Sequence, residues 1–215
     1  MLSFYRSTVG KKIIMAATGV ILIGFVIVHM SGNLLAFKGQ ESLDHYGALL
    51  KTSKPFVWTV RLVLLASVVL HIVSGLQLTR LAQTGRPEGY ARREPQASTL
   101  ASRTMRVGGF VLLFFIIFHL LHFTTGTVHP DFIEGAVYHN LITGLQVPAV
   151  AAFYIVAMAA LSLHLYHGAS SLFQTLGLSH PSWNPGRQLL MRAVALLVSL
   201  GFVSIPVAVM LGILK

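Results

Sequence analysis

The chain has 215 residues, of which 54% are hydrophobic and 10% charged, and its formal net charge is +10. A soluble domain carries roughly a quarter charged residues, so this composition excludes an ordinary soluble domain and indicates a membrane protein. The sequence contains no cysteine. This excludes disulfides, thiolate ligation of haem and a cysteine-bound iron–sulfur cluster within the chain.

Five apolar stretches are each long enough to cross a bilayer, which takes about 20 residues. They cover residues 13–37, 56–81, 107–127, 147–176 and 189–214. Lys11 and Lys12 precede the first stretch as in a signal peptide, but its apolar run is too long and no small-residue cleavage site follows. The expected fold class is all-α: one polytopic membrane domain over residues 1–215, with five transmembrane helices in an antiparallel bundle.

The connections between these helices differ in charge, which predicts their orientation. Eleven of the sixteen Lys and Arg residues fall before the first helix, between the second and third, and between the fourth and fifth. Basic connections stay in the cytoplasm, so the N-terminus is expected inside and the C-terminus outside. The same rule explains the positive charge without a nucleic-acid partner. The longest connection, 83–104, is arginine-rich and is either a docking surface or a solvated loop.

Six of the ten histidines fall within the predicted helices. They are His29, His71, His119, His122, His164 and His167. A histidine in hydrocarbon is costly and is therefore a functional candidate. The other four lie in predicted loops, where solvated surface is the simpler interpretation. These are His45, His129, His139 and His180.

The depths of the helical histidines fall into two layers. At about 1.5 Å per residue, His29 lies roughly 24 Å from the cytoplasmic end of the first helix, and His119 lies just past the middle of the third. His71 and His164 belong to helices that enter from outside, and both lie in the inner half. Each layer offers one histidine from each of two helices, as a haem b with two axial imidazoles requires. The alternative ligands in the two layers are His122 and His167.

Two glycines favour particular ligands. Gly75 follows His71 by four residues, and Gly168 follows His164 by four, so each glycine shares a helix face with its histidine. A glycine at that place leaves room for the flat face of a porphyrin, which favours His164 over His167. The competing explanation is that glycines ease helix packing in membranes generally.

Several polar residues keep open roles. His122 and His167 would contact haem propionates, carry protons, bond backbone carbonyls, or simply pack. Candidates for a quinone site lie near both membrane surfaces, although solvation or binding of haem propionates explains each of them better. They are Asp44, His45 and Tyr46 on the outer side, and Ser7, Lys11 and Arg106 on the inner side.

Four segments resemble the cytochrome b558 membrane-anchor subunit of succinate dehydrogenase and fumarate reductase, in its five-helix dihaem form. They are "MAATGVILIGFVIVHMSGNL", "MRVGGFVLLFFIIFHLLHF", "FYIVAMAALSLHLYHG" and "SLFQTLG". The resemblance covers nearly the whole chain. It is specific for the four helices that carry histidines, and it is weak for the loops and the fifth helix.

The resemblance implies two b haems with one ligand histidine on each of the first four helices. His29 and His119 would hold the iron of the distal haem, and His71 and His164 that of the proximal haem. The chain would anchor respiratory complex II of the tricarboxylic acid cycle in the bacterial cytoplasmic membrane. It would carry electrons from a flavoprotein and an iron–sulfur subunit to quinone, with menaquinone favoured over ubiquinone. Succinate chemistry itself would lie outside this chain, which supplies the quinone-reactive part.

Two other classes of protein compete with this interpretation. One is an unrelated dihaem cytochrome of the b561 type, which would also react with quinone. The other is a transporter whose histidines bind a transition metal or relay protons. Transporters often show inverted repeats and broken helices. This sequence shows no such repeat and has no Asp or Glu within its apolar stretches to relay protons.

Overall fold

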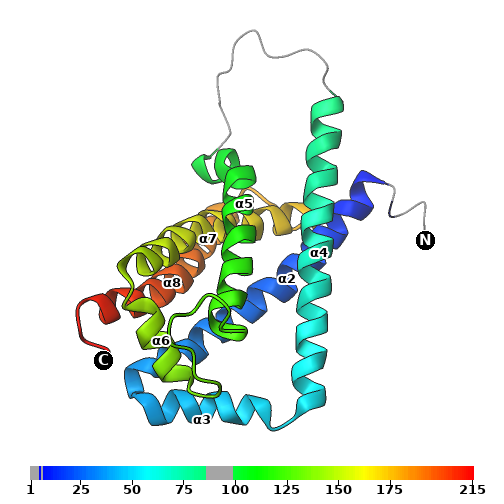
Figure 1. The fold of residues 1–215 in the computed structure, drawn as a ribbon. Coiled ribbons are helices and arrows are strands. Elements are labelled where there is room, and N and C mark those ends of the chain that lie inside the picture. Colours follow the sequence, from blue (N-terminus) through cyan, green and yellow to red (C-terminus); the bar gives the residue numbers. More distant parts are fainter. Residues whose placement is uncertain (1–4, 6, 86–98) are drawn as a thin grey trace.

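The structure is a computed structural model that describes residues 5, 7–85 and 99–215 (Figure 1). All the regular secondary structure in these residues is helical, and they contain no strand. The predicted all-α class is therefore confirmed. Most of the arginine-rich connection that was predicted to be a docking surface or a solvated loop lies outside the described residues.

Five helices in the described residues are long and apolar enough to cross a membrane. They are α2 (Thr8–Asn33), α4 (Lys54–Thr84), α5 (Leu100–His119), α7 (Pro148–Thr175) and α8 (Asn184–Met210). Two of them continue into short turns of other geometry, the 3₁₀ turn η1 (Leu34–Lys38) after α2 and the π turn η2 (Leu120–Thr124) after α5. The five predicted spans, and with them the membrane character of the chain, are confirmed.

Most of these helices begin earlier than the apolar stretches do. Ser7, Ser53 and Thr99 each accept a hydrogen bond from a backbone N–H in the first turn of the helix that follows. Such caps satisfy N–H groups that have no partner within the helix. These three helices therefore start at a capping residue in the polar flank, whereas hydropathy marks only the apolar part.

Two helices lie where the sequence predicted loops. They are α3 (Gln40–Lys51) and α6 (Val137–Leu145). Leu43 of α3 and Leu145 of α6 are both at most 2% exposed, because each helix turns one apolar face towards the long helices. The two helices contact each other at one end of the bundle, which we call the α3/α6 end (Figure 1). The loop prediction was wrong here, and His45 and His139 lie in α3 and α6 respectively.

The long helices pack unevenly. Helix α7 packs against both α5 and α8, and α2 packs against α4 (Figure 1). The main apolar cluster lies towards the α3/α6 end and includes Leu141, Leu145 and Tyr154 together with Ile205 and Val209 of α8. Helix α4, which is described in full, buries only two residues, Ser67 and Ser74. Most of its apolar surface is therefore left to the surroundings of the chain.

Candidate functional site: two pairs of histidines

The first pair joins α4 and α7. The ring centroids of His71 and His164 are 6.1 Å apart, and the ring planes are inclined at 54°. Nδ1 of His71 lies 3.1 Å from the hydroxyl oxygen of Thr18, which is also 2.8 Å from the carbonyl oxygen of Ile14. A hydroxyl has one hydrogen, so when Thr18 donates to the carbonyl it accepts from Nδ1–H of His71. That arrangement leaves the lone pair of His71 Nε2 available for a metal.

The second pair joins α2 and the end of α5, nearer the α3/α6 end. The ring centroids of His29 and His119 are 5.8 Å apart, and the ring planes are nearly perpendicular at 84°. Both imidazoles are held among aromatic rings. Phe25 stacks on His29 at 5.2 Å, and Phe115 stacks on His119 at 5.6 Å.

Both separations suit axial ligation of one metal ion. An imidazole nitrogen binds a metal at about 2 Å, so two imidazoles on opposite sides of one ion have their centroids roughly 6 Å apart. The observed 6.1 Å and 5.8 Å are close to this value. No group of three or more His, Asp or Glu side chains that could hold a metal ion occurs in the described residues.

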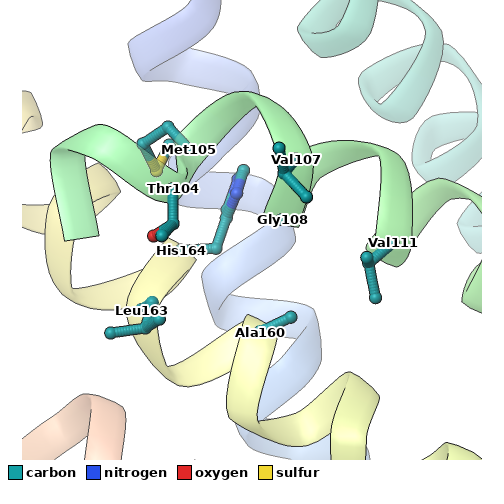
Figure 2. Close-up of a pocket in the computed structure, with 8 residues that line it drawn as sticks. All are labelled: Thr104, Met105, Val107, Gly108, Val111, Ala160, Leu163 and His164. Carbon is teal, nitrogen blue, oxygen red and sulfur yellow. The ribbon is translucent and has the colours of Figure 1, made fainter. Parts of the chain in front are cut away.

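The surroundings of His164 leave space for a bulky group. A cavity of about 180 Å³ lies between α5 and α7 beside this histidine, and Figure 2 shows its side chain extending from α7 towards α5. The cavity walls are formed mainly by apolar side chains, with Gly108 among them. A Cβ atom added to Gly168 would meet nothing within 4 Å, and one added to Gly75 would meet only Met15, at 3.8 Å. The open helix faces at Gly75 and Gly168 are what the flat face of a porphyrin beside this pair would need.

The two remaining helical histidines have other neighbours. Nδ1 of His122 lies 3.1 Å from the hydroxyl oxygen of Tyr154, and its ring stacks on His129 at 4.8 Å. Nε2 of His167 lies 3.2 Å from Oγ of Ser171. His167 thus bonds within its own helix, whereas His122 contacts Tyr154 of α7 and His129 in the connection that follows it.

His129 is a residue that sequence reasoning assigned to solvated surface, and that assignment was wrong. It is only 8% exposed. Its Nε2–H donates to the carbonyl oxygen of Asn140 at 2.8 Å, and its Nδ1 accepts from the N–H of Asp131 at 3.1 Å. The burial arises from contacts with α6, and a stretch that was predicted to be a loop gave no signal for it.

The outer quinone candidates have distinct environments. A carboxylate oxygen of Asp44 accepts the N–H of Tyr138 at 2.8 Å, so this side chain caps the first turn of α6. His45 is exposed on α3. The ring of Tyr46 lies so close to Gly32 that a Cβ atom there would be 2.5 Å from it. Tyr46 therefore packs within one turn of His29, and Asp44 has a structural partner.

The inner quinone candidates also have different environments. Ser7 caps α2 by accepting the N–H of Gly10 at 2.9 Å. Lys11 is buried, and its ammonium donates to the carbonyl oxygen of Tyr5 at 3.0 Å. Arg106 is exposed on α5. Of the three, only Lys11 combines a positive charge with burial.

Comparisons with protein-family models, with curated proteins and with solved structures return no match to this chain. The fold and the site define its class, a multi-pass helical membrane protein in which two pairs of histidines face each other across the bundle. The resemblance to a cytochrome b558 anchor stays a prediction.

Proposed function

We propose that this chain is the dihaem cytochrome b anchor of a succinate:quinone oxidoreductase in a bacterial cytoplasmic membrane. The observation that carries the proposal is the pairing of histidines, with centroids 6.1 Å apart for His71 and His164 and 5.8 Å apart for His29 and His119. Ligation by two imidazoles offsets the cost of placing these side chains in hydrocarbon. The haem iron supplies the one-electron chemistry, and the protein holds and orients its ligands.

The protein's own residues account for the remaining requirements. When the Thr18 hydroxyl donates to the carbonyl oxygen of Ile14, it accepts the Nδ1 proton of His71. Metal-binding histidines usually have such an acceptor for their second ring N–H. Because the chain has no cysteine, the flavin and iron–sulfur centres belong to partner subunits in the cytoplasm. His71 and His164 would hold one haem and His29 and His119 the other, and the two haems would supply a path for electrons between these levels. Tyr46, beside Gly32, is the outer quinone candidate that packs closest along the chain to His29.

Haem occupancy of single alanine variants tests the assignment. The complex would be purified from membranes, and its haems counted and titrated potentiometrically. We expect His71→Ala and His164→Ala to remove or shift one redox centre, and His29→Ala and His119→Ala to affect the other. His180→Ala, in an exposed connection, serves as the matched control and should retain both centres.

Three results would contradict the proposal. Wild-type protein without haem would exclude a cytochrome. Loss of the same centre in His29→Ala and His71→Ala would exclude the two-level arrangement. A haem-loaded chain that purifies without any flavoprotein or iron–sulfur protein would favour an unrelated dihaem cytochrome of the b561 type.

Transfer between the two levels moves charge across the membrane. One elementary charge that crosses 100 mV is worth about 2.3 kcal/mol. If quinone reacts at the α3/α6 end, then succinate:quinone turnover in intact cells should change when an uncoupler collapses the membrane potential. Unchanged turnover would place the quinone reaction on the same side as the partner subunits.

A further inference from the structure

One hydroxyl group links a histidine of the second pair to a buried histidine outside it. The hydroxyl oxygen of Tyr154 lies 3.3 Å from Nδ1 of His119 and 3.1 Å from Nδ1 of His122. Tyr154 is 9% exposed and His122 is 1% exposed, so neither group exchanges these contacts for bulk water. The contacts connect α7, the end of α5 and the π turn η2.

The number of hydrogens restricts how these three groups bond. A tyrosine hydroxyl donates once, so it donates to one Nδ1 and accepts from the other. If it donated to His119, then His119 would carry its proton on Nε2, and that nitrogen would have no lone pair for a metal. If it accepts from Nδ1–H of His119 and donates to His122, then Nε2 of His119 is free to ligate. This second arrangement is the only one that agrees with His119 as a ligand through Nε2.

Helix α6 holds His122, the histidine that contacts Tyr154 on the side away from His119. Nε2 of His122 is buried without a hydrogen-bond partner among the described residues, and in this arrangement it carries the proton of the ring, which packing holds in place. The ring lies between His129, which stacks on it at 4.8 Å, and the backbone at Gly144. A Cβ atom on Gly144 would come within 2.8 Å of Nε2 of both histidines. Helix α6 therefore restricts the position of His122, and through it that of Tyr154.

We propose that Tyr154 is a positioning residue for His119: its hydroxyl accepts the Nδ1 proton of His119 and donates to His122, which fixes the tautomer and the ring orientation that ligation of a haem iron requires. This inference rests on the proposed function. The inference also gives His122 a role that the sequence left open: its Nδ1 accepts from the hydroxyl of Tyr154 and so orients it. Such outer partners of a ligand histidine typically contribute 10-fold to 100-fold to metal affinity.

The two pairs share this design. Thr18 stands to His71 as Tyr154 stands to His119, since each places a hydroxyl oxygen 3.1–3.3 Å from Nδ1. Nδ1 of His164, in contrast, is buried without a partner among the described residues. One histidine of each pair is therefore fixed by a hydroxyl group.

The test is Tyr154→Phe in the purified complex, because this change keeps the ring that packs on Phe115 at 4.9 Å and removes only the hydroxyl. The matched control is Tyr166→Phe on the same helix, whose hydroxyl meets the exposed Arg192 at 3.3 Å. The readouts are the potential and the EPR signal of each oxidised haem. We expect the centre that His119→Ala removes to shift, and the other centre and both centres of the control to stay unchanged. A tenfold change in its oxidation equilibrium would appear as about 59 mV for a one-electron couple.

His122→Ala provides a second variant that leaves the tyrosine in place. We expect it to shift the same centre by less than Tyr154→Phe does, because the hydroxyl can still accept from His119. If both variants leave the potential and the EPR signal of that centre unchanged, the inference is overturned while the dihaem assignment stands. Wild-type protein without haem would overturn the proposed function instead. If Tyr154→Phe cannot be recovered as a complex, an unshifted centre in His122→Ala overturns the inference alone.

Discussion

Substitution of Gly144 by alanine should destabilise the protein by overpacking. The added Cβ atom would lie 2.7 Å from Cε1 of His122, and 2.8 Å from Nε2 of both His122 and His129. Normal contacts begin near 3.4 Å, so the two rings must retreat by about 0.6 Å. These are ring atoms of buried side chains rather than the ends of flexible ones. Overpacking of this kind costs about 1–3 kcal/mol.

The measurement needs a control for the general effect of replacing glycine in a helix, which alone favours alanine by roughly 0.5–1 kcal/mol. Gly24 of α2 supplies it, because a Cβ atom there meets nothing within 4 Å. For a chain of this size, 1 kcal/mol corresponds to roughly 2–4 °C in Tm. Thermal unfolding in detergent should therefore give Gly144→Ala a Tm about 2–12 °C below that of Gly24→Ala. Equal Tm values for the two variants would show that the rings yield without cost, and the argument that α6 restricts His122 would fail.

Three further outcomes are expected from single substitutions. Asp44→Ala removes the acceptor for the N–H of Tyr138 and should cost about 1 kcal/mol, seen as a lower Tm, while Asp44→Asn should recover most of it because the amide oxygen also accepts. Gly201→Ala brings a Cβ atom to 2.6 Å from Sδ of Met30, but because this flexible side chain can move aside, the loss by the same assay should be below about 1 kcal/mol. His167→Ala should retain both haems in the pyridine haemochromogen assay, and loss of a haem would identify His167 as a ligand.

The spans and the histidine levels could be predicted because both follow from fixed lengths. A bilayer requires about 20 apolar residues, and a helix rises about 1.5 Å per residue, so hydropathy locates the helices and counting locates each histidine along them. The histidines that counting placed at one level are those whose rings the structure brings together. Their ligation of iron stays a prediction.

The polar contacts around those histidines could not be predicted in the same way. Helices α3 and α6 are short, and their burial depends on the long helices, so hydropathy alone treats them as loops. His129 is buried only because α6 folds over it. Tyr154 did carry a signal, since a tyrosine within an apolar span needs a partner for its hydroxyl. From the sequence we compared only the depths of the histidines and therefore did not consider Tyr154.

The sparse burial of α4 has a consequence for biogenesis. This helix packs against α2, buries only Ser67 and Ser74, and meets α7 through His71 and His164. Under the proposed function, haem at that pair would cross-link α4 to α7, and a ligand present at 100 times its Kd adds about 2.7 kcal/mol to stability. The contact between α4 and α7 would then depend on the haem supply, while α4 stays packed against α2. In haem-starved cells the chain would lack this cross-link, and we would expect it to unfold at a lower temperature than the haem-loaded protein.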